Sequence, residues 1–226
     1  MLILNNLVGF GAGGVTTSLS FLQGSVSGDD SATYTFSSQN LGAADPNRWI
    51  VVCATGIQNA ARTIDAVTVG GVSATKIVEA EASAYRSVSI WVAYVPTGTT
   101  GDIVLTFSSG LVRAGYSAYR LITETNPTTA YDTETDTTTS GSDLSVSINR
   151  PGGGVVIAAT VAVCSTATSV TWSGTSENYD AAYPDAAAQG MSSSSVASGA
   201  SPLTVTATIS GTLVAGSQAL AAASFY

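Results

Sequence analysis

The stretch Trp49-Ile50-Val51-Val52-Cys53-Ala54 is apolar at every position, and Val155–Val163 is apolar at all but one. A strand with one face in water alternates polar and apolar residues, whereas a strand covered on both faces does not. These two stretches therefore predict central strands that are buried on both sides within a layered β structure.

Four other runs alternate with a period of two, which is typical of strands with one buried face. Their apolar positions are Ala32, Tyr34 and Phe36; Val88, Ile90, Val92 and Tyr94; Ile103, Leu105 and Phe107; and Leu203, Val205, Ala207 and Ile209. Gly70-Gly71 stands between two valines and predicts a two-residue hairpin, because both central residues of that turn need positive φ. The sequence predicts an all-β fold, an antiparallel β-sandwich of the jelly-roll-like type.

The length of 226 residues fits one sandwich domain, which we expect over residues 16–226. Residues 1–15 form either a short N-terminal arm or a first strand. Polar or small residues dominate 123–143 and 173–202, and both segments are expected to be long loops. A domain boundary near residue 125 is less favourable, because two half-domains would expose much sheet edge.

The charge balance excludes several kinds of partner. Seven Lys and Arg face 15 Asp and Glu, for a formal net charge of −8, and the arginines are scattered. Nucleic acids and anionic membranes both require clustered basic residues, so neither is expected as a partner. The start of the chain lacks the basic and long apolar regions of a secretory signal. Assembly in the cytoplasm, without export machinery, is the expectation.

The chain contains no histidine, which removes the commonest acid–base catalyst and any Ser-His-Asp triad. We therefore expect no enzymatic activity and no cofactor. Cys53 and Cys164 each end or lie in a strand-like run, and they either form a disulfide or remain buried free thiols. Two thiols without an imidazole do not predict a zinc site.

Asp132, Glu134 and Asp136 are spaced so that an extended chain places their carboxylates on one face. Such a row suits a hard cation such as Ca²⁺. The alternative is an acidic edge that opposes strand-on-strand aggregation. Asp29-Asp30 lies in a Gly- and Ser-rich stretch and predicts a turn in which Asp bonds its own backbone.

Two groups of residues are candidate partner contacts. Tyr179 and Tyr183 lie on the expected loop 173–202, where an exposed aromatic ring suits binding. The arm carries the second group of candidates, Leu2, Leu4, Leu7 and Phe10. The glycines that follow would let this arm pair with another subunit by strand addition.

Several stretches resemble a widespread group of virion proteins of tailed bacteriophages and prophages. The similar stretches are Leu41–Arg48 running into Trp49–Val52, Val67–Thr75, Val88–Trp91 and Pro96–Asp102. The resemblance covers residues 40–122. It implies a β-sandwich module on the outside of a virion, as a head decoration or cement protein, a head spike or a tail appendage.

The resemblance implies no catalytic residues. It implies a non-enzymatic structural protein of the virion that binds the major capsid protein or another virion protein, and a homo-oligomer in which a trimer is favoured. The alternative is a tail-fibre or receptor-binding module that recognises a glycan or protein of the host surface.

Overall fold

The computed structural model describes residues 17–57, 63–82, 86–110, 113–138, 143–164, 166, 169–184 and 186–226, with the backbone only for 186–189, 213 and 215–217. Within these residues every element is a strand, and every strand pair is antiparallel, which confirms the predicted all-β class.

Seventeen strands follow one another within the described residues. The first nine are β1 (Ser18–Ser27), β2 (Thr33–Asn40), β3 (Arg48–Ile57), β4 (Ile64–Val69), β5 (Val72–Ser73), β6 (Thr75–Ala82), β7 (Arg86–Tyr94), β8 (Thr100–Phe107) and β9 (Arg113–Ile122). The other eight are β10 (Asp132–Thr138), β11 (Asp143–Ile148), β12 (Val155–Cys164), β13 (Ser169–Ser173), β14 (Ser176–Tyr183), β15 (Ala186–Val196), β16 (Leu203–Ser210) and β17 (Leu213–Phe225).

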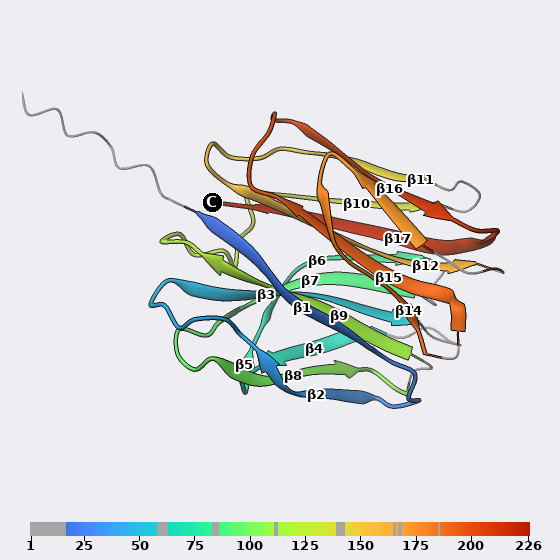
Figure 1. Ribbon diagram of the computed structural model, residues 1–226, viewed down its shortest axis with the longest axis horizontal. Coiled ribbons are helices and arrows are strands. Elements are labelled where there is room, and N and C mark those ends of the chain that lie inside the picture. Colours follow the sequence, from blue (N-terminus) through green and yellow to red (C-terminus); the bar gives the residue numbers. More distant parts are fainter. Residues whose placement is uncertain are drawn as a thin grey trace, which may run out of the picture.

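The strands form four sheets that are stacked as four layers (Figure 1). The first sandwich consists of the sheet β2-β8-β4-β5 and the sheet β1-β9-β3-β7-β6. The second sandwich consists of β10-β17-β12-β15-β14 and β11-β16-β13. The two five-stranded sheets face each other in the middle of the stack, and the smaller sheets lie outside.

The two sandwiches have the same topology. The strands β10 to β17 correspond in chain order to β1 to β9, with β13 as the single equivalent of β4 and β5. With this correspondence, the five-stranded sheets have the same strand order, and so do the two smaller sheets. Across the central interface β1 lies against β14, β3 against β12, and β6 against β10 and β17. The two orders thus run in opposite directions, as a two-fold rotation about an axis along the central strands produces. The chain is packed like a symmetric dimer within one polypeptide.

Three apolar cores explain why β3 and β12 have two apolar faces. Ile50, Val52 and Ala54 pack into the core of the first sandwich, whereas Val51 and Cys53 pack into the core between the sandwiches. β12 divides its side chains in the same way between the central core and the core of the second sandwich. Both predicted central strands are confirmed.

The predicted hairpin at Gly70-Gly71 is also confirmed, since β4 pairs with β5 and both glycines have positive φ, 57° and 80°. The jelly-roll type of connection stays a prediction. The described residues form two stacked sandwiches, whereas a single domain over residues 16–226 stays a prediction. Stacking the sandwiches face to face covers their inner sheet faces with the central core.

The loop predictions need correction as well. Residues 173–202 contain β14 and β15, and residues 123–143 contain β10. These strands are rich in short polar side chains and so lack the apolar alternation that predicts a strand. Their hydroxyl and carboxylate groups form hydrogen bonds within the chain, as those of Ser193 and Asp136 do.

The repeat left a weak signal in the sequence. Val67-Thr68 and Gly71 recur as Val170-Thr171 and Gly174, at the ends of the equivalent strands β4 and β13. The φ angles of Gly71 and Gly174 are 80° and 82°. Comparison of the sequence with itself reveals a repeat of this kind.

Candidate functional site

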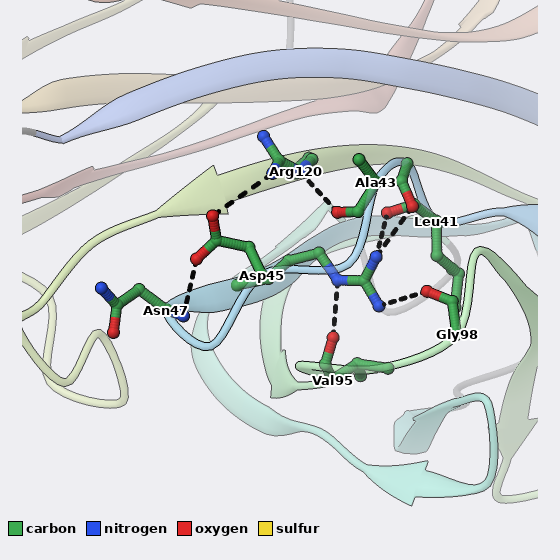
Figure 2. Close-up of polar contacts among 9 residues, drawn as sticks. Leu41, Ala43, Asp45, Asn47, Val95, Gly98 and Arg120 are labelled. Carbon is green, nitrogen blue, oxygen red and sulfur yellow. Dashed lines mark hydrogen bonds and ion pairs between the residues drawn. The ribbon is translucent and has the colours of Figure 1, made fainter.

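Arg48 begins the central strand β3 and is the largest fully buried side chain that carries a charge. Its guanidinium lies between the loop before β3 and the loop that joins β7 to β8 (Figure 2). All five of its N–H groups donate to backbone carbonyl oxygens. The acceptors are Val95 at 2.6 Å, Leu41 at 3.1 Å, Gly42 at 2.8 Å, Thr97 at 2.7 Å and Gly98 at 2.8 Å.

Burial lowers the pKa of Arg48, and the nearby Arg120 acts in the same direction. Arg120 itself forms a long ion pair with Asp45, at 3.8 Å, and donates to the Ala43 carbonyl at 3.0 Å. Charge-assisted hydrogen bonds to carbonyl oxygens offset the desolvation of the buried cation. No donor of Arg48 remains for an anionic ligand, so the arrangement is a structural clamp on two loops.

Arg150 repeats this clamp in the second sandwich. It precedes β12, the equivalent of β3, and donates to Gly154 at 2.8 Å and to Gly199 at 2.6 Å. Gly199 lies in the loop between β15 and β16, which is equivalent to the loop between β7 and β8. Within the described part of the chain, Arg150 Nε is buried without a hydrogen-bond partner. The sequence analysis missed both arginines, although each lies close to the start of one of the two long apolar strands.

The acidic row is extended, as the metal hypothesis required, but two of its carboxylates have other partners. Asp132 Oδ2 accepts hydrogen bonds from the Asn149 amide at 2.7 Å and from its side chain at 2.9 Å. Asp136 Oδ2 accepts one from the Ser145 amide at 2.7 Å. β11 is an edge strand that pairs only with β16. The two carboxylates accept hydrogen bonds from backbone amides on the unpaired side of β11 and just after it.

Glu134 lies between them on β10 and is half-buried. Among the described residues, no group of three or more His, Cys, Asp or Glu side chains is placed to hold a metal ion. The hydrogen bonds favour the alternative, in which the acidic row protects a sheet edge. Asp29 accepts a hydrogen bond from the Ser27 hydroxyl at 2.9 Å in an exposed stretch, a side-chain contact and not the bond to its own backbone that was predicted.

Tyr179 and Tyr183 lie on β14 and contact the first sandwich, so their placement on an exposed loop is wrong. The ring of Tyr179 is stacked on Phe21 with centroids 6.4 Å apart, and it covers the backbone at Gly24. Tyr183 is only 2% exposed, and its hydroxyl lies 2.7 Å from the Thr55 hydroxyl. Burial raises the pKa of Tyr183. Both tyrosine rings therefore pack against other parts of the same chain.

Ser192–Ser195 form part of β15, and every one of their hydroxyls has a hydrogen-bond partner. Ser192 donates to the Tyr179 carbonyl at 2.8 Å, and Ser193 accepts from the Tyr119 hydroxyl at 2.8 Å across the central interface. The serine run thus allows close packing of β15 and satisfies buried polar groups.

Cys53 and Cys164 are both buried and are not joined by a disulfide, which agrees with the alternative of buried thiols. They lie in different cores. Burial raises the pKa of Cys53 to about 12, so its thiol is protonated and unreactive at neutral pH.

The candidate contacts Leu2, Leu4, Leu7 and Phe10 lie outside the described residues, so the arm stays a prediction. No membrane-spanning helix occurs in the part of the chain that the structure describes. Comparisons with models of protein families, with curated proteins and with solved structures find no match to this chain. Function is therefore inferred from the residues and their geometry.

Proposed function

We propose that this chain is a non-enzymatic structural protein of a virion exterior, bound to the capsid surface as a decoration or cement protein or as a head spike. The resemblance of residues 40–122 to virion modules supports this setting. The outward surface of the stack supports the role, because it offers hydroxyl groups on rigid strands and few charges.

The outer face of the sheet β11-β16-β13 carries this proposal. Side chains alternate along each strand, and those that point away from the core are almost all Ser or Thr. They are Asp143, Ser145 and Ser147 on β11, Thr204, Thr206, Thr208 and Ser210 on β16, and Ser169, Thr171 and Ser173 on β13. Neighbouring hydroxyls bond one another, with Ser145 and Thr206 at 2.9 Å and Ser169 and Ser210 at 2.7 Å. Such a face forms many weak polar contacts with another protein surface.

The interior supports a durable scaffold. Polar side chains that other proteins use for chemistry are here held by carbonyls, amides and hydroxyls of the stack, as in the case of Arg48 and Ser193. The chain has no histidine, and burial keeps the Cys53 thiol protonated. A protein that must persist outside a cell benefits from this kind of rigidity.

The proposed partner is the major capsid protein or another virion protein, and a homo-oligomer, with a trimer favoured, matches the symmetry of such shells. Particles that lack the chain should lose an outer density and become more sensitive to heat and osmotic shock. Full resistance of those particles, with the outer density unchanged, would exclude a role on the shell.

A further inference from the structure

A pocket of about 370 Å³ lies where the two sandwiches meet, between β6 and the chain that enters β10. It is lined by Ile77, Thr128, Thr129, Ala130, Tyr131, Asp132 and Thr133. Ile77 belongs to the first sandwich, and Asp132 and Thr133 belong to the second. The pocket therefore exists because the sandwiches are stacked, and its volume is in the range of sites for small molecules.

Tyr131 gives the pocket an aromatic wall that is open to solvent. The residue is 48% exposed. The ring of Tyr226 packs edge-on against it, with centroids 5.1 Å apart and an interplanar angle of 88°. This contact restricts the orientation of Tyr131, so that binding a ligand costs little side-chain entropy.

The polar groups of the pocket are mostly uncharged hydroxyls. Three of the lining residues are threonines, and Lys and Arg are absent from the lining. The single carboxylate, on Asp132, is held by Asn149. Lys76, next to Ile77 in the chain, pairs with Glu79 at 2.5 Å and lies over the Trp91 ring. The lining thus offers no cation to an anionic ligand, and the net charge of −8 opposes one further.

We propose that this pocket binds a neutral saccharide. The apolar C–H face of a sugar ring stacks on an aromatic side chain, while its hydroxyls exchange hydrogen bonds with threonine hydroxyls and backbone groups. A lone apolar ligand would leave the threonines unpaired, and a phosphate or acidic sugar would meet no positive charge. The site gives the chain an affinity for surface glycans in addition to its proposed role on the virion.

Titration of the purified full-length protein with lactose, cellobiose, maltose and N,N′-diacetylchitobiose, followed by NMR or calorimetry, tests the site. Sialyllactose is the anionic comparison. At least one neutral disaccharide should bind saturably, and Tyr131→Ala should weaken that binding about tenfold or more. Tyr131→Phe keeps the ring and should retain most of the affinity. Thr128→Val removes one hydroxyl at nearly constant shape and should weaken binding.

Tyr94→Ala is the matched control, because Tyr94 is similarly exposed, at 46%, but does not line the pocket. Circular dichroism of each variant checks the fold. The inference fails if none of the four neutral disaccharides binds, if sialyllactose binds as well as they do, or if Tyr94→Ala and Tyr131→Ala reduce binding equally. Each of these results concerns purified protein, so none of them bears on whether the chain belongs to a virion shell.

Discussion

Arg48 is the first residue of β3 and Arg150 precedes the equivalent strand β12, and each guanidinium binds carbonyl oxygens of the same two equivalent loops. Arg48 uses all five donors in full burial, whereas Arg150 is half-buried and leaves Nε unpaired among the described residues. The clamp thus occurs in both sandwiches, but the two examples differ in burial and in the number of hydrogen bonds.

Replacing Arg48 should therefore cost more than replacing Arg150. Arg48→Met leaves five carbonyl oxygens without their donors and should lower the free energy of unfolding by about 3 kcal/mol. Arg150→Met should lower it by about 1 kcal/mol. Arg48→Lys should fall between wild type and Arg48→Met, because an ammonium has three donors and no planar fork. Urea denaturation measures all three variants, and equal losses for the two Met variants would contradict the unequal clamps.

The repeated glycines offer a second comparison. Gly174 and Gly71 have nearly the same φ, but a Cβ atom on Gly174 would lie 2.0 Å from the Thr204 carbonyl oxygen, whereas a Cβ on Gly71 meets nothing within 4 Å. Gly71→Ala should cost about 1 kcal/mol through backbone strain alone. Gly174→Ala should cost clearly more, because β16 must move. Thermal unfolding of both variants decides this, and a Gly174→Ala protein as stable as Gly71→Ala would be inconsistent with the described turn.

The edge-protecting role of Asp136 can be followed at one amide. Asp136→Ala removes the acceptor of the Ser145 amide and should lower the free energy of unfolding by about 1 kcal/mol. Hydrogen exchange at Ser145 should become faster, while Asp136→Asn, which keeps a side-chain oxygen, should preserve most of the protection. Thr135→Ala, on the opposite face of β10, is the control. Unchanged exchange at Ser145 in Asp136→Ala would refute the edge-protecting role.

Tyr183 makes the central interface sensitive to alkaline pH. Because burial raises its pKa above the usual 10.0, the folded state holds the phenol proton more tightly than the unfolded state does. Its contribution to stability is present below about pH 10 and is lost as pH rises toward the folded-state pKa.

Tyr183→Phe should accordingly be less stable than wild type by about 1 kcal/mol at neutral pH, because it loses the hydrogen bond to Thr55. The difference should shrink above about pH 10, because only the wild type has a phenol at position 183 that can ionise. Thr55→Val removes the same hydrogen bond but keeps the phenol, so its difference from wild type should not shrink in this way. Urea midpoints across this pH range provide the measurement, and a constant difference for Tyr183→Phe would contradict the assignment.

Much of the fold could be predicted from the sequence, because apolar periodicity reports burial directly. The two-faced run around Val51 and the alternation of Leu203–Ile209 both predicted the correct strands and faces. The number of layers could not be predicted in that way. A strand covered on both faces has the same pattern whether one sheet or a second sandwich covers it.

The polar strands were missed for a related reason. Ser192–Ser195 lack the apolar alternation of a strand because their hydroxyls bond inside the stack. Tyr179 and Tyr183 were then assigned to a loop, although they join the two sandwiches. The carboxylates of Asp132 and Asp136 were correctly placed on one face, but their partners on β11 depend on tertiary packing that local spacing does not encode.

The number of copies of this chain in each virion tests the central proposal most directly. Quantitative mass spectrometry of purified particles, prepared from the proposed phage or prophage, gives this number relative to the major capsid protein. A decoration, cement or spike protein of the shell should be present in many copies, in a fixed ratio to the capsid protein. A few copies per particle would point instead to a tail module, and absence from purified particles would contradict a virion role altogether.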